Sequence, residues 1–164
     1  MSFSQAHTFL SGIKYEKSNW FLEQVIATAD QELGSRKVKF LLDVPQQDGG
    51  QWDMVVALFE KYGVVPRAAY PESISSSNSR ELNQYLNKLL RQDAQILREA
   101  IAAGADDKAV QAKKEALLQE VFNFLAINLG LPPRTIDFAY RDKDNNYHSD
   151  KNITPQEFFK NMLV

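Results

Sequence analysis

Residues 80–130 read RELNQYLNKLLRQDAQILREAIAAGADDKAVQAKKEALLQEVFNFLAINLG, and they carry the longest regular pattern in the chain. Its apolar residues recur every three or four positions on both sides of Gly104, which is the period of an amphipathic helix. Asp106-Asp107 supplies capping chemistry for the second half, and Gly130 ends that half before Pro132-Pro133. The stretch therefore predicts two long helices, from about 80 to 103 and from about 107 to 129, joined as an antiparallel hairpin.

The N-terminal segment also has helical periodicity. Apolar residues at helical spacing over residues 4–33 predict a helix that is broken near Gly12 and ended by Gly34. Three large aromatic residues lie on this pattern and are expected in the core rather than on a binding surface: Phe9, Trp20 and Phe21.

Two further segments lead into the long hairpin. An apolar run over 38–42 stops at Pro45, and a second pattern predicts a helix over 51–62 that Gly63 ends. The serine-rich run 73–79 is dense in capping residues and predicts a loop that begins a helix.

After the long hairpin, the pattern changes from helical to alternating. Residues 136–141, IDFAYR, alternate with period two and Asn145-Asn146 offers turn residues, which together predict a short β-hairpin. Thr154-Pro155 then begins a last short helix with proline at its first position. The predicted fold class is mainly α with a small β-hairpin (α+β). No linker or repeat divides residues 1–164, so we expect one unit.

Composition excludes several classes of function. The chain has 164 residues, of which 44% are apolar and 24% are charged, and 19 basic against 21 acidic residues give a net charge of −2. With charges so nearly balanced, the chain has no electrostatic attraction as a whole to nucleic acid or anionic lipid. No apolar run approaches the roughly 20 residues that span a bilayer. We therefore expect a cytoplasmic protein without nucleic-acid or membrane partners. With no cysteine, disulfides, thiolate zinc sites and thiol catalysis are excluded within the chain.

Two features that resemble metal sites have simpler explanations. Residues 142–153 begin like a calcium-binding EF-hand loop, but Tyr147 and Ile153 stand where that loop needs glycine and glutamate. We interpret the segment as a polar hairpin turn. His7 and His148 have no partner at metal-ligand spacing, so each is expected to be a surface or capping histidine. The sequence predicts no metal and no cofactor.

Residues 48–66, DGGQWDMVVALFEKYGVVP, are similar to the signature that follows the nucleophile region in aminopeptidase C and bleomycin hydrolase. Other stretches resemble family elements in family order, namely Phe3-Ser-Gln, Tyr70-Pro-Glu-Ser, residues 140–147 and residues 153–158. The resemblance covers essentially all 164 residues and implies an internal fragment of a papain-like cysteine peptidase. It assigns residues 1–79 to the helical lobe. Residues 80–164 become a helical insertion with the β-hairpin and a short terminal helix.

The resemblance also implies a substrate-binding rim. In papain-like enzymes the second glycine of the Gly-Gly pair offers its backbone N–H and C=O to the substrate, and by position that residue is Gly50. Two backbones can pair in this way only where no side chain stands between them. Trp52 takes the position that lines a specificity pocket, and Asp48 and Gln51 flank the same rim beside Gly49. From the residues alone, the glycine pair could equally be the turn before a helix.

The family's catalytic residues have no counterpart in the chain. The resemblance places the nucleophilic cysteine before residue 1 and the catalytic histidine and asparagine after residue 164, so no catalytic residue is assigned here. It implies peptide substrates and a hexameric ring for the intact protein. We expect the chain alone to be inactive. We also expect it to expose apolar surface, from the stripes of its two long helices and around Trp20. The alternative is a stand-alone helical module for oligomerisation or interaction, without catalysis.

Overall fold

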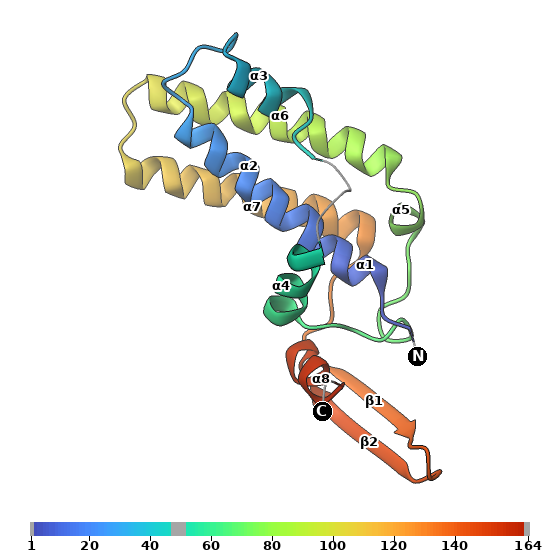
Figure 1. The fold of residues 1–164 in the computed structure, drawn as a ribbon. Coiled ribbons are helices and arrows are strands. Elements are labelled where there is room, and N and C mark those ends of the chain that lie inside the picture. The colour runs from blue at the N-terminus through green and yellow to red at the C-terminus, as the bar shows by residue number, and fades with distance from the viewer. Residues whose placement is uncertain (1, 47–51, 163–164) are drawn as a thin grey trace.

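The computed structural model describes residues 2–46 and 52–162. In chain order its elements are α1 (Gln5–Thr8), the π-helical turn η1 (Phe9–Lys14), α2 (Tyr15–Ala27), α3 (Arg36–Asp43), α4 (Trp52–Tyr62), α5 (Ile74–Ser77), α6 (Arg80–Ala102), α7 (Asp107–Leu129), β1 (Ile136–Arg141), β2 (Tyr147–Ile153) and α8 (Pro155–Met162). The long helices α2, α6 and α7 lie at one end, and the β1–β2 hairpin with α8 lies at the other (Figure 1). The predicted mainly α fold with one β-hairpin is confirmed.

The larger core lies between α2 and the α6–α7 hairpin. From α2 it buries Phe21, Leu22 and Val25. From the hairpin it buries Leu82, Leu86, Leu90, Ala94, Leu97, Val110, Leu117, Leu118, Val121, Leu125 and Leu129. Each large apolar side chain contributes about 1.5–3 kcal/mol when fully buried. The expectation that the stripes of both long helices face partners outside the chain is therefore wrong, because α2 covers them.

A smaller core joins the β-hairpin to the rest of the chain. It buries Val64 and Val65 after α4, Ile136 of β1 and Phe158 of α8. The chain can turn sharply into this core because Gly63 has a φ of +71°, and a Cβ there would lie 2.1 Å from the backbone carbon of Pro155. The glycine thus lets the start of α8 approach the end of α4.

The ends of the long helices follow the predicted chemistry. Asp106 caps α7 by accepting a hydrogen bond of 2.7 Å from the backbone N–H of Ala109. Gly104 and Gly130 end the two helices with φ values of +85° and +92°. The Tyr70 hydroxyl donates to the carbonyls of Leu129 and Gly130, at 2.8 and 2.6 Å. The last turn of α7 is thereby tied to the segment after α4.

The N-terminal helix differs from its prediction in three ways. The backbone continues through Gly12 as the π-helical turn η1, and α2 ends at Ala27 rather than near Gly34. The hydroxyl of Thr28 donates to the Gln24 carbonyl at 2.7 Å, which satisfies an end carbonyl and stops the helix. Trp20 is 55% exposed, so its assignment to the core is wrong, whereas Phe21 is fully buried. The side chain of Phe9 lies outside the described residues.

Residues 136–153 form the predicted hairpin, with β1 and β2 antiparallel and Tyr140 opposite His148. Asn145 has a φ of +66°, as its turn position requires. The carboxylate of Asp142 accepts hydrogen bonds from the backbone N–H groups of Asp144 and Asn146, both at 2.9 Å. Asp142 therefore organises the turn itself, as the polar-turn interpretation predicts.

Candidate functional site

The predicted rim falls largely outside what the structure describes. Asp48, Gly49, Gly50 and Gln51 lie outside the described residues, and Trp52 is the first residue of α4. The side chain of Trp52 is 74% exposed, so its indole is open to a binding partner. The geometry of the site must therefore be built from the two segments that flank residues 47–51.

The preceding segment is fixed by Gln46, which is buried. Its side-chain amide donates to the carbonyl of Lys14 at 3.1 Å and to the hydroxyl of Ser18 at 2.8 Å. Its backbone N–H donates to the side-chain oxygen of Asn87 at 2.9 Å. A single residue thus joins the end of η1, the first turns of α2 and the middle of α6. Sequence reasoning missed it, because Gln46 stands in a polar run that looks like an exposed loop.

The following segment, α4, packs against η1 through a close approach. An added Cβ at Gly12 would lie 2.5 Å from the side chain of Leu58, so a larger residue there would require that leucine side chain to move. Both flanks of residues 47–51 are therefore held on the same π-helical turn. Such turns are rare inside α-helices and are often found at functional sites.

The surface of α4 beside this position is apolar. Trp52, Met54 and Val56 are all exposed, and none of the eleven residues of α4 is buried. These three side chains are thus available for contact. An open apolar surface next to a predicted backbone-pairing loop is the arrangement that peptide recognition needs.

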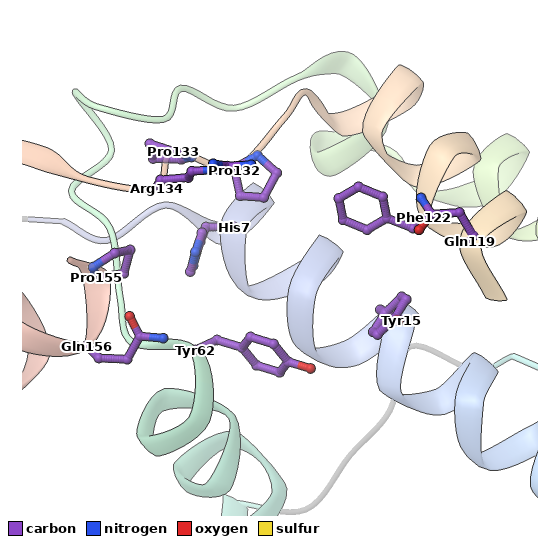
Figure 2. Close-up of a pocket in the computed structure, with 10 residues that line it drawn as sticks. All are labelled: His7, Tyr15, Tyr62, Gln119, Phe122, Pro132, Pro133, Arg134, Pro155 and Gln156. Carbon is purple, nitrogen blue, oxygen red and sulfur yellow. The ribbon is translucent and has the colours of Figure 1, made fainter. Parts of the chain in front are cut away.

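A separate pocket of about 520 Å³ lies where α1, α2, α4, α7 and α8 converge. Figure 2 shows its lining side chains: His7, Tyr15, Tyr62, Gln119, Phe122, Pro132, Pro133, Arg134, Pro155 and Gln156. This set contains no thiol, no hydroxymethyl group and no carboxylate. The pocket consequently has no nucleophile and acid–base pair of the kind that hydrolyses peptides.

His7 is the one titratable imidazole in this lining, and it is only 4% exposed. His7 is therefore not at the surface, and that part of its prediction is wrong. Its ring packs edge-on against Tyr70, with ring centres 6.2 Å apart. Burial lowers the pKa of His7 to about 4, so the ring is neutral at pH 7. No local sequence signal indicates this burial, since it depends on Tyr70 far along the chain.

At the edge of the same pocket, Tyr62 donates a hydrogen bond to Glu16, which also accepts one from Lys61. Burial, with the charge and hydrogen bond of Glu16, raises the pKa of Tyr62 to about 12. The phenol is accordingly neutral at physiological pH and acts as a donor. This cluster ties the last turn of α4 to α2.

His148 is at the surface of the β-hairpin, where its Nε2 lies 2.9 Å from a carboxylate oxygen of Asp142. This contact, followed by hydrogen bonds from Asn146, lowers the pKa of Asp142 to about 2.

Within residues 2–46 and 52–162 there is no group of three or more His, Cys, Asp or Glu side chains that could hold a metal ion. None of the helices described in that range is long and apolar enough to cross a membrane.

Comparison with known proteins gives consistent matches over the whole chain. A model of the Peptidase C1-like family matches residues 1–164. Aminopeptidase C of Streptococcus thermophilus is 79% identical over 160 residues, which cover 98% of this chain and 36% of that protein. Aminopeptidase C of Lactococcus lactis subsp. lactis (strain IL1403) is 64% identical over 161 residues, covering 98% of this chain and 35% of that protein.

A solved structure matches as well. The crystal structure of PepW from Lactobacillus rhamnosis HN001 superposes with a TM-score of 0.92 at 55% identity, and the match covers 97% of this chain and 35% of that one. The chain thus spans about a third of the length of the relatives it matches.

Proposed function

Because this chain belongs to the Peptidase C1-like family, we propose that it is a segment of a cysteine aminopeptidase that removes N-terminal residues from peptides. The 79% identity to an aminopeptidase C over nearly the whole chain carries this proposal. Within the intact enzyme, a thiolate supplied by the remaining sequence attacks the peptide carbonyl, since this chain contains no cysteine.

The part of the reaction that we assign to this chain is substrate binding. We place Gly50 on the rim of the cleft, where its backbone pairs with the substrate backbone. Asp48, Gly49 and Gln51 flank it, and Trp52 lines a specificity pocket. Two observations support this assignment: the indole of Trp52 is open to contact, and Gln46 and Gly12 fix the flanking segments on one π-helical turn.

Alone, the chain should not hydrolyse peptides. It offers no thiol, and its two imidazoles are engaged elsewhere, His7 in a buried neutral state and His148 beside Asp142.

We include in the proposal a cytoplasmic location and a ring-shaped homo-oligomer whose active sites receive peptides. Large apolar side chains at the surface support such assembly: Trp20, Phe40, Ile74, Ile127 and Leu131. The alternative is a stand-alone helical module that assembles through these residues without chemistry.

The test is a chimaera in which this chain replaces the matching third of S. thermophilus aminopeptidase C. We expect the chimaera to release the chromophore from aminoacyl chromogenic substrates with a kcat/KM within about threefold of that of the natural enzyme. The isolated chain should show no thiol-dependent turnover. A folded chimaera without activity would refute the proposed function and leave the interaction module as the better explanation.

A further inference from the structure

The pocket of Figure 2 has no part in the proposed function, and we propose that it binds a small apolar molecule that carries one carboxylate group. The inference goes beyond the proposed function and rests only on the side chains that line the pocket. Its volume of about 520 Å³ falls within the roughly 300–1,000 Å³ of typical small-molecule sites. Such sites have mostly apolar walls and a small number of polar groups, and this lining has the same composition.

The walls of the pocket are aromatic rings and prolines. Tyr15 of α2 and Phe122 of α7 pack edge to face, with ring centres 6.1 Å apart. Tyr62 lines the pocket from the end of α4, and Pro132 and Pro133 line it from the segment after α7. An apolar ring that enters the pocket would displace water from these surfaces and could pack against the aromatic rings.

Several of these walls are held in place without a ligand. The Tyr62 hydroxyl donates a hydrogen bond to Glu16. The ring of His7 packs edge-on against Tyr70, with ring centres 6.2 Å apart, and the φ angles of the prolines are fixed by their own rings. Binding would therefore cost little free energy for ordering the site, which favours measurable affinity for a small ligand.

The charge of the lining selects for an anion. Among the described residues that line the pocket, Arg134 alone is charged at pH 7, because burial lowers the pKa of His7 to about 4. Within residues 2–46 and 52–162 the Arg134 guanidinium has no hydrogen-bond or ion-pair partner. The carboxylate of Glu16 at the pocket edge is already paired with Lys61. A ligand carboxylate could thus form the paired N–H···O bonds that a guanidinium favours.

The positions of these groups define the shape of the ligand. Figure 2 shows Arg134 beside the two prolines, with the rings of Tyr15 and Phe122 farther along the same pocket. A molecule with a carboxylate at one end and an apolar ring at the other matches this order. Aromatic rings can also attract cations, but a cationic ligand would be repelled by Arg134.

The experiment titrates the 164-residue chain with phenylpropionate at pH 7 and follows the ring protons of its two histidines by NMR. The His7 resonances should shift because His7 lines the pocket, whereas His148 on β2 lies outside the lining and serves as the internal reference. We expect a Kd of about 1 mM, as for other ligands of this size. Phenylpropionamide, which lacks the charge, should bind about fivefold more weakly. Acetate, which lacks the apolar body, should bind at least about tenfold more weakly.

Two variants test the role of Arg134. Arg134→Met keeps an apolar stem and removes the charge, so it should weaken phenylpropionate about fivefold and leave phenylpropionamide within about twofold. Arg67→Met changes an exposed arginine that is not part of the lining, and it should bind both compounds as the wild type does.

No shift of His7 at about 20 mM phenylpropionate, or equal shifts of His7 and His148, would overturn the site. Equal affinities for phenylpropionate and phenylpropionamide, or equal effects of Arg134→Met and Arg67→Met, would overturn the assignment to carboxylate ligands. If Arg134→Met does not fold, the comparison of the two compounds on the wild-type chain decides the question by itself.

Discussion

Asp93, in the middle of α6, should make the stability of this chain depend on pH. The side chain is 1% exposed, and within the described part of the chain its Oδ2 has no hydrogen-bond partner. Burial, with a smaller contribution from the charge of Glu120, raises the pKa of Asp93 from 3.8 to about 7. In the unfolded chain the same carboxyl ionises near its ordinary value.

The direction of the pH effect on stability depends on whether the folded or the unfolded chain holds the proton. Between about pH 4 and pH 7 the folded chain holds a proton that the unfolded chain has released, so the free energy of unfolding falls as pH rises through this window. At about 1.36 kcal/mol per pH unit, and with the curve flattening above pH 7, the wild type should lose about 2–3 kcal/mol between pH 5 and pH 8 from this group. Asp93→Asn cannot ionise and should lose none of it.

The assay is urea unfolding of the wild type and Asp93→Asn at pH 5, 6, 7 and 8. The difference between the two free energies of unfolding should shift by about 2–3 kcal/mol in favour of Asn across the series. Any constant penalty from the amide cancels in this comparison. Asp30→Asn, an exposed aspartate in the turn after α2, serves as the control and should give a flat difference. Parallel curves for wild type and Asp93→Asn would refute the reasoning.

Two further predictions rest on contacts described above, and a third rests on the proposed substrate rim. Gly63→Ala should lower the free energy of unfolding by more than about 2 kcal/mol, because its Cβ would collide with Pro155 and φ is positive; a melt within 2 °C of wild type would contradict this. Tyr70→Phe removes the donor to Leu129 and Gly130 and should cost about 1–3 kcal/mol in urea unfolding, with Tyr85→Phe on the exposed face of α6 as a neutral control. In the chimaera, Gly50→Val should reduce kcat/KM by about tenfold or more; a variant that melts like the wild type and keeps its kcat/KM within about threefold would place Gly50 off the rim.

Sequence reasoning succeeded where the deciding interactions are local. The α6–α7 hairpin follows from apolar spacing, from Gly104 and from the Asp106 cap, all within a few residues of the structure they specify. The β-hairpin follows in the same way from period-two alternation and from Asn145 in its positive-φ position. Each of these signals is complete within its own segment.

Prediction from the sequence failed where a residue is held by a partner that is distant in the sequence. The carboxylate of Glu72 accepts the backbone N–H groups of Gln5 and Ala6, at 2.6 and 3.0 Å, and so caps α1 from 66 residues away. His7 is buried for the same kind of reason, because Tyr70 packs on it. Trp20 is exposed although it lies beside Phe21, since a helical stripe is wider than the face that α2 buries. Such outcomes depend on which segments meet in space, which periodicity does not specify.

The candidate site combines both cases. The assignment of the glycine pair and Trp52 to a rim comes from a local motif and only through resemblance, because two glycines before a helix are by themselves a common turn, and it stays a prediction. The residues that hold the flanks, Gln46 and Arg91, have no motif of their own. Arg91 would pass in sequence as one of many solvated charges on an amphipathic helix. Its two hydrogen bonds to the end of α3 form because α3 and α6 meet in space, which the spacing of charges along one helix does not specify.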